Sequence, residues 1–199
     1  DKGYFCIAKK SDNSRWHGVP TVNGDYVEFA YTADPMTSSE MSGFTPDSKY
    51  RLYVKTTPDG KVFAKVVSLT KVTISGATVT ATGLPEALNG KKLYFTGDFN
   101  GWKAPGDAAT IEGTVTDGKI TITLPNFSKD FEGAEKQEFT VEGKFASGDG
   151  TWARPEIGVK EGNIKFTLTA EKKALKGTFV EKTPHKDGGD IYVCNWVVE

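Results

Sequence analysis

The chain has 199 residues, of which 37% are hydrophobic, 26% charged and 12% aromatic, a composition typical of a folded protein with one large or two small domains. Its 25 basic and 26 acidic residues leave a formal net charge of −1 with both signs interspersed, which argues against nucleic acid as a partner. No apolar run approaches the roughly 20 residues that a membrane-spanning helix needs.

The first residues of the chain and its few cysteines and histidines indicate how the protein is processed and whether it holds a disulfide or a metal. The sequence opens with Asp1-Lys2-Gly3-Tyr4, without an initiator Met or a signal segment, which predicts a processed or shortened protein. Cys6 and Cys194 lie near opposite ends, so they form either one disulfide or two free buried thiols. His17 and His185 stand apart from both cysteines without metal-ligand spacing, so we expect no metal and no other cofactor.

Short segments alternate apolar and polar residues with a period of two, as strands with one buried face do, and none of them has helical period. They are residues 26–31, 50–54, 119–124 and 164–168. Dipeptides that favour tight turns separate such segments: Asn23-Gly24, Asp59-Gly60, Asn89-Gly90, Asp117-Gly118 and Asp149-Gly150. Residues 171–176 permit at most a turn or two of helix. The pattern therefore predicts an all-β fold of antiparallel sheets packed as a sandwich.

The front of the chain can be aligned with the back, which indicates an internal repeat. The aligned pairs are Phe5 with Phe139, Trp16 with Trp152, residues 29–34 with 166–171, and residues 57–58 with 183–184. This alignment predicts two tandem immunoglobulin-like sandwiches that join near residues 69–75. The first, residues 1–71, lacks its opening strands, and the second, residues 72–199, is complete.

The most specific string in the chain is Leu93-Tyr94-Phe95-Thr96-Gly97-Asp98-Phe99-Asn100-Gly101-Trp102. It predicts a strand in which Leu93 and Phe95 face the core, followed by a turn from which Trp102 emerges on the loop side. A flat indole at a strand end can stack on a pyranose ring, while neighbouring polar groups such as Asn100 bind the ring hydroxyls. The alternative is that Trp102 closes the end of its own sandwich.

Over roughly residues 91–169 the chain resembles the glycogen- and starch-binding modules of carbohydrate-binding module family 48, which have the early-set immunoglobulin-like fold. Those modules carry a G-x-F-N-x-W turn, then a D-G turn and strand, then F-x-V-x-G, and finally a second Trp. The corresponding segments of this chain follow in the same order: residues 97–102, 117–125, 139–143 and Trp152.

The resemblance implies that Trp102 and Trp152 stack on sugar rings and that Asn163 binds a sugar hydroxyl. Asn100, in the turn itself, is a second candidate for hydroxyl binding. The family's strand lysine falls on Glu138, a departure that could change the ligand or abolish binding. Lys136 lies on the same face of the expected strand and is the candidate substitute, which completes the expected ligand-binding set: Trp102, Trp152, Asn163, Asn100 and Lys136.

Tandem sandwiches of this kind also resemble the surface starch-binding lipoproteins of gut Bacteroidetes, an analogy of architecture that does not by itself fix function. It implies a monomer outside the cell or on the outer-membrane surface, with a polysaccharide or oligosaccharide and other outer-membrane glycan-uptake proteins as partners. Within this analogy Trp16 is either a second, weaker sugar contact or a core residue.

The chain lacks the motifs of common enzyme classes: there is no G-x-S-x-G nucleophile elbow, no H-E-x-x-H and no phosphate-binding glycine loop. A glycosidase pair of facing carboxylates stays open on sequence alone. We therefore expect non-catalytic binding of an α-glucan or related polysaccharide. The alternative is a structural or adhesive cell-surface subunit, in which Trp102 and Trp152 are core or interface residues and residues 192–198 pair with a neighbouring chain.

Overall fold

The protein is all-β and its chain forms two compact units. The computed structural model describes residues 3–9, 11, 14–33, 39–41, 43–133 and 135–199. The first unit comprises Asp1–Val72 and Lys129–Lys136, and the second comprises Thr73–Ser128 and Gln137–Glu199. The segment Lys129–Lys136 thus belongs to the first unit, whereas the sequence analysis assigns it to the second.

The first unit is built from a two-stranded sheet and a six-stranded sheet. In the small sheet, β1 (Gly3–Phe5) pairs antiparallel with β5 (Ser39–Met41). The larger sheet has the order β12-β7-β4-β3-β2, with β6 also paired to β7. Its strands are β2 (Ile7–Ala8), β3 (Arg15–His17), β4 (Val27–Thr32), β6 (Lys49–Thr56), β7 (Val62–Ile74) and β12 (Phe127–Glu132).

Apolar residues of neighbouring strands form the core of the first unit. Phe29, Val62 and Ala64 are buried, and Ile7 and Trp16 pack against them. Val62 lies directly opposite Phe29 in the antiparallel β4–β7 pair, so one face of that pair carries the core. Trp16 is therefore a packing residue, the second of the two roles that the sequence left open.

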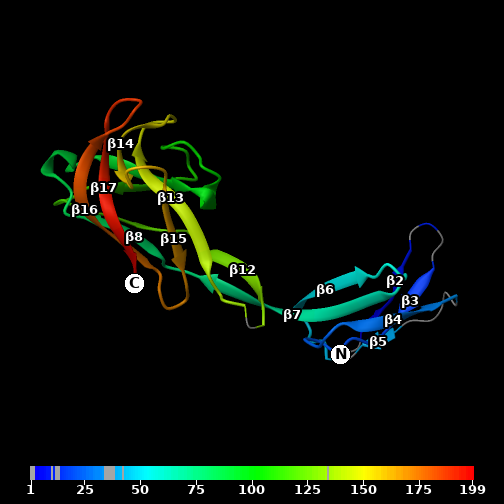
Figure 1. Cartoon of the computed structure of the whole chain (residues 1–199). Helices are drawn as coiled ribbons and strands as arrows, with labels where there is room; N and C mark the ends of the chain where they lie inside the picture. Colours follow the sequence, from blue (N-terminus) through cyan, green and yellow to red (C-terminus); the bar gives the residue numbers. More distant parts are fainter. Residues whose placement is uncertain (1–2, 10, 12–13, 34–38, 42, 134) are drawn as a thin grey trace. The chain divides into compact units, whose positions relative to one another are not determined.

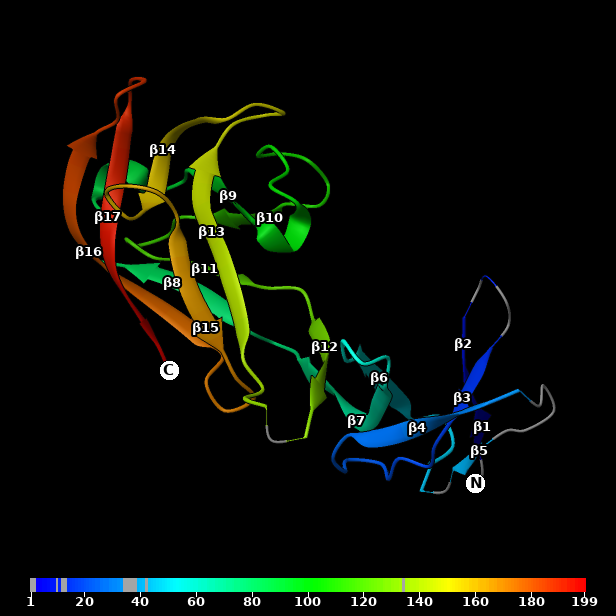
Figure 2. The same ribbon diagram turned by 45° about the vertical axis from the view of Figure 1, so that its right-hand side comes forward.

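The second unit is a nine-stranded sheet with the order β10-β9-β13-β14-β17-β16-β8-β11, and β15 pairs with β13 (Figures 1 and 2). Its strands are β8 (Thr78–Thr82), β9 (Lys92–Gly97), β10 (Ile111–Thr114), β11 (Ile120–Thr123), β13 (Phe139–Ser147), β14 (Ala153–Gly158), β15 (Ile164–Leu168), β16 (Ala174–Pro184) and β17 (Asp190–Val198). Two short 3₁₀ helices, η1 (Glu86–Leu88) and η2 (Asp98–Asn100), interrupt the connections.

This sheet curves back on itself around its core. Its two terminal strands, β10 and β11, are consecutive in the chain and are joined at the bridge between Thr116 and Lys119. The Asp117-Gly118 turn between them has positive φ at both residues, as a tight hairpin turn requires. Apolar side chains from many strands of this sheet consequently pack against one another on its inner face.

Alternation along the strands separates core from surface. Leu93 and Phe95 of β9 are fully buried, which confirms the predicted orientation, and the Phe95 ring meets that of Phe145 edge to face at 4.9 Å between ring centroids. The four segments with period-two alternation all lie in strands: β4, β6, β11 and β15.

Residues 171–176 contain no helical turn, which is within the expected limit of a turn or two, and Ala174 already belongs to β16, where it lies opposite Thr78 of β8. Within the segment 192–198, Tyr192 and Val193 pair with both β14 and β16, whereas residues 194–198 pair with β16 alone among the described strands (Figure 1), so strand addition at this segment stays a prediction.

The two cysteines are free, with Cys194 buried and Cys6 partly exposed. The repeat alignment stays a prediction, because the two units differ in strand number and order. Its aligned tryptophans also differ: Trp16 lies in β3 against the core, whereas Trp152 precedes β14 and is 41% exposed.

Candidate functional site

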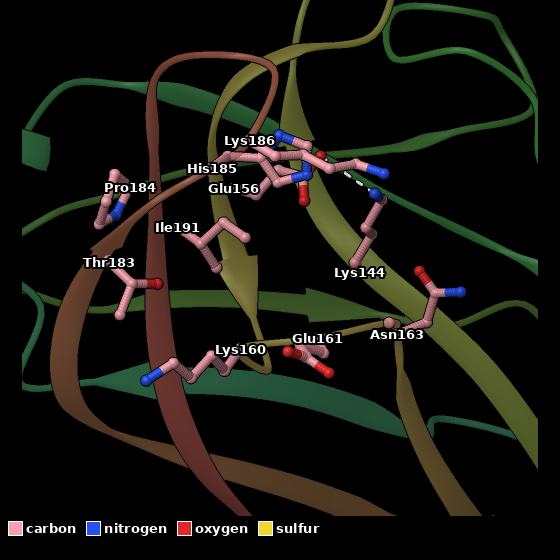
Figure 3. A pocket seen from close by; sticks show the side chains of 11 residues that line it. Lys144, Glu156, Lys160, Glu161, Asn163, Thr183, Pro184, His185, Lys186 and Ile191 are labelled. Atoms are coloured by element: carbon pink, nitrogen blue, oxygen red, sulfur yellow. Dashed lines mark hydrogen bonds and ion pairs between the residues drawn. The ribbon is translucent and has the colours of Figure 1, made fainter.

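The second unit carries a hollow of about 690 Å³ on the face of its sheet opposite the core residues Phe145 and Ile157 (Figure 3). Four neighbouring strands provide its floor: Lys144 from β13, Glu156 from β14, Ile191 from β17 and Thr183 from β16. The loop 160–163 after β14 borders it on one side, and Pro184, His185 and Lys186 at the end of β16 border it on another. The site therefore rests on strands, and only its rim consists of loops.

A buried carboxylate organises the floor of the hollow. Glu156 is only 5% exposed, and its Oε1 accepts from Lys144 Nζ at 3.0 Å and from Arg154 Nη1 at 2.8 Å. Ala146 of β13 lies directly opposite Glu156 of β14, so both side chains are on the same face of the sheet. Lys144, two residues before Ala146, is on that face too and is the diagonal neighbour of Glu156, which brings its ammonium group to the carboxylate. A buried charge must be compensated, so both cations are held in place by this one acid.

Arg154 also anchors the loop between β16 and β17. Its Nη2 donates to His185 Nδ1 at 2.8 Å, and the backbone N–H of Asp187 donates to the same ring nitrogen at 3.1 Å. Because a guanidinium only donates, Nδ1 of His185 acts as the acceptor. A Cβ at Gly189 would lie 2.5 Å from the Arg154 Cβ, so only glycine allows the loop to pack this closely.

Trp152 lies at the edge of this network. The residue is 41% exposed, and Lys144 Nζ lies over its ring at 5.0 Å from the centroid, within cation–π range. A second hollow of about 400 Å³ adjoins the ring and is lined by Trp152, Ala153, Arg154, Asp187, Gly188 and Gly189. The β16–β17 loop therefore contributes to both hollows, and Arg154 and Lys144 connect the exposed indole with the larger one.

Asn100 stabilises the turn after β9, because both the oxygen and the nitrogen of its side-chain amide form hydrogen bonds within that turn and the following loop. Its Oδ1 accepts from the backbone N–H of Gly97 at 3.1 Å and lies 3.2 Å from the Thr96 hydroxyl oxygen, whose single hydrogen has a closer acceptor in the carbonyl oxygen of Lys103 at 2.7 Å. Its Nδ2 donates to the carbonyl oxygen of Ala109 at 3.0 Å. The hydrogen-bonding groups that the sequence analysis assigned to a sugar are thus used within the protein.

Trp102 is partly buried and is fixed by its backbone. Its φ is +57° after Gly101 at +66°, and its N–H donates to the carbonyl oxygen of Gly97 at 2.8 Å. The loop that follows Trp102 contacts the loop that precedes Trp152, since the N–H of Gly150 donates to the carbonyl oxygen of Pro105 at 2.8 Å. The structure thus brings together the two loops that carry the expected tryptophans.

Asn163 lines the larger hollow with Lys144 and Glu156, at the start of β15 (Figure 3). Its Nδ2 donates to Glu142 Oε1 at 2.9 Å, which leaves its carbonyl oxygen as the end available to a ligand. Of the expected ligand-binding residues, Asn163 and Trp152 therefore share one neighbourhood, connected through Lys144.

Lys136 is assigned to a different unit from Trp152. It belongs to the segment Lys129–Lys136 of the first unit, and Trp152 belongs to the second. The expected strand that would place Lys136 and Glu138 on one face is also wrong, because β13 begins at Phe139. Lys136 as the substitute for the family's lysine stays a prediction, and Lys144 supplies an ammonium at the hollow itself.

Sequence reasoning missed Lys144, Arg154, Glu156, His185 and Lys186. Alternation along residues 139–145 does place Glu142 and Lys144 on the face away from the core, a signal that was available. The partners of Lys144 come from strands distant in sequence, and no local pattern indicates that pairing.

A third hollow, of about 670 Å³, lies within the first unit. Its wall includes Glu132, whose carboxylate accepts from the Tyr53 hydroxyl and from Arg51 Nη1. These hydrogen bonds, that of Tyr53 first, lower the pKa of Glu132. Lys65 Nζ lies 5.0 Å from the Tyr53 ring centroid, the same distance as Lys144 Nζ from the Trp152 ring centroid.

Two searches over the described part of the chain had negative outcomes. No group of three or more His, Cys, Asp or Glu side chains there is arranged to hold a metal ion. No described helix has the length and apolar character needed to cross a membrane.

Comparisons of the chain with protein-family models, with curated proteins and with solved structures found no significant match. Function must therefore be argued from the residues that the fold assembles.

Proposed function

We propose that the second unit is a non-catalytic carbohydrate-binding module with an early-set immunoglobulin-like sandwich fold, which holds a polysaccharide through Trp152 and the adjoining hollow. The supporting observation is that Trp152, a residue 41% exposed, lies next to Lys144, which itself lines a hollow of about 690 Å³. Sugar recognition needs this combination of an aromatic face for C–H groups and fixed donors and acceptors for hydroxyls.

The polar wall suits hydroxyl groups, which both donate and accept. Lys186 and Lys144 offer ammonium donors, while Glu161 and the carbonyl oxygen of Asn163 offer acceptors. Glu156 is buried and bound by two cations, so it serves to position Lys144 and does not act as an acid or base. This arrangement supports binding without catalysis.

An α-glucan or related polysaccharide is the proposed ligand, on the strength of the motif order from Gly97 to Trp152. Trp102 is the second proposed platform, since its loop contacts the loop before Trp152. The proposed setting is the cell exterior or outer-membrane surface, where a monomeric lipoprotein of this kind acts beside other glycan-uptake proteins. Binding at one shallow site is expected to be weak, on the order of micromolar to millimolar.

Titration of intrinsic tryptophan fluorescence with glycogen, amylopectin, dextran and xylan tests the proposal. We expect a saturable change with at least one polymer, lost in Trp152→Ala and weakened in Trp102→Ala. Trp16→Phe is the control, because Trp16 packs on the core of the first unit. A response that Trp152→Ala leaves intact, or no response to any glycan, would refute the proposal.

The alternative function is a structural or adhesive subunit that joins other chains through a sheet edge. One observation favours it: β6 pairs only with β7 among the described strands, and its Leu52 and Val54 are 46% and 47% exposed. Exposed apolar residues on an edge strand favour strand addition. Sedimentation distinguishes the two functions, because concentration-dependent self-association without glycan binding is expected only for the adhesive subunit.

A further inference from the structure

The proposed glycan site carries an excess of positive charge at one end of its larger hollow. Lys144 and Arg154 share the single carboxylate of Glu156, and these three side chains are 20%, 19% and 6% exposed, respectively. Two cations and one anion leave one net positive charge where solvent screening is reduced. This charge lies beside Trp152, with Lys144 Nζ 5.0 Å from the ring centroid.

Lys186 adds a second positive charge to the same hollow. It lines the hollow from the end of β16, and in Figure 3 its side chain extends toward that of Lys144. Among the described residues no hydrogen bond or ion pair holds its ammonium group. Its donors are therefore available to a ligand.

Glu181 is the nearby carboxylate that a cation outside the pair Lys144–Arg154 balances, since it lies 3.6 Å from Lys160. Glu142 accepts from the neutral amide of Asn163 and keeps its negative charge. Asp187 faces solvent with a side chain 71% exposed and lines the smaller hollow. Glu161, on the loop after β14, is the remaining acidic residue in the lining of the larger hollow.

We infer that this hollow binds an anionic substituent of the glycan, a carboxylate or a sulfate ester, at Lys144 and Lys186. The inference rests on the proposed function and specifies its ligand class: a sugar ring stacks on Trp152, and the oxyanion of the same or the next sugar unit enters the hollow. Charge-assisted hydrogen bonds from two ammonium groups are stronger than those to neutral hydroxyls, so an acidic glycan is preferred over its neutral counterpart.

Three polymers with one backbone test this inference: dextran, carboxymethyl-dextran and dextran sulfate. Titration of the full chain at low salt is expected to show that one or both charged polymers bind about tenfold more tightly than dextran. Screening by added salt is expected to remove this preference without changing the affinity for dextran. Preference for only one charged polymer identifies the substituent as a carboxylate or a sulfate.

Lys186→Gln is the informative variant, because its exposed, unpartnered side chain can be changed without disturbing Glu156. It is expected to weaken binding of the preferred charged polymer about fivefold, as for loss of one ion pair of about 1 kcal/mol, and to leave dextran binding unchanged. Lys119→Gln, outside the lining and exposed, is the matched control and should retain the full preference.

Equal binding of the three polymers would overturn the inference while leaving the proposed function standing, provided that Trp152→Ala abolishes binding. Equal losses in Lys186→Gln and Lys119→Gln would also overturn it, because they would indicate unspecific attraction of a polyanion. Binding that persists undiminished in Trp152→Ala would instead remove the proposed function itself.

Discussion

At the scale of single residues, the most informative difference between sequence and structure concerns Asn100. The G-x-F-N-x-W string predicts a turn, and the turn is present as η2 followed by Gly101 and Trp102 at positive φ. The amide oxygen accepts from the backbone N–H of Gly97, however, and Nδ2 donates to the carbonyl oxygen of Ala109, so the side chain holds the turn. A motif identifies where a side chain occurs, but its hydrogen-bond partners depend on a loop that returns nine residues later.

Asn100→Ala should consequently lower the stability of the protein, and it should not remove a direct contact with a glycan. Loss of these hydrogen bonds is expected to cost about 1–3 kcal/mol of unfolding free energy. Urea denaturation measures this difference, with exposed Asn126→Ala as the control within about 0.5 kcal/mol of wild type. Equal midpoints for both variants would show that the turn does not depend on the amide.

Cys194 offers a second test at this scale. Burial raises the pKa of its thiol to about 12, and the side chain is 3% exposed. At pH 8 only about 0.01% of such a thiol is ionised, so Ellman's reagent should react with Cys6 alone in the native protein. Unfolding in denaturant should release the second equivalent, and fast reaction of both thiols without denaturant would contradict the packing of β17.

The raised pKa of Cys194 predicts that the free energy of unfolding falls at high pH. Above the ordinary cysteine pKa the unfolded thiol loses its proton while the folded thiol keeps it, so the unfolded state is favoured. The Cys194 contribution should thus fall by up to about 1.4 kcal/mol per pH unit as the pH rises from about 9 toward 12. In Cys194→Ala this part of the pH dependence should be missing from the unfolding curves.

At the scale of strands, alternation predicts which segments form β-structure and which face is buried. Leu93 and Phe95 illustrate this, because their burial follows from the period of two alone. The partnership of Lys144 with Glu156 does not follow from the period, since it depends on the register between β13 and β14. Strand order, with β17 between β14 and β16, is likewise set by non-local pairing.

The strand pair β13–β14 should depend strongly on its buried acid. Glu156→Gln removes the charge that Lys144 and Arg154 share, and we expect a loss of about 3 kcal/mol because both cations are partly buried. Glu181→Gln is the matched control: its pair with Lys160 is exposed, so its loss should cost less than about 1 kcal/mol. Thermal or urea unfolding compares the two, and similar losses would show that burial adds nothing to the pair.

At the scale of the whole chain, the sequence predicts a division near residue 71, and the two units divide after Val72. It does not predict that Lys129–Lys136 returns to the first unit. Strand β12 shows why: its apolar residues Phe127 and Phe131 are four positions apart with polar residues between them, so no period of two marks the strand, and which sheet accepts it depends on the edge that β7 offers. Lys136 was assigned to the wrong unit for this reason, and with it one member of the expected binding set.

The central proposal is that a glycan lies against Trp152 in the second unit. The four tryptophans can be followed separately by NMR of their indole Nε1–H groups. Titration with a dextran or maltose oligomer should shift the Trp152 signal in a saturable manner, with a smaller shift for Trp102. Trp16, on the core of the first unit, and Trp196, whose Nε1 donates to the carbonyl oxygen of Gly158, should not move. A Trp152 signal that stays fixed while glycan binds, or up to the highest glycan concentration, would contradict the proposal.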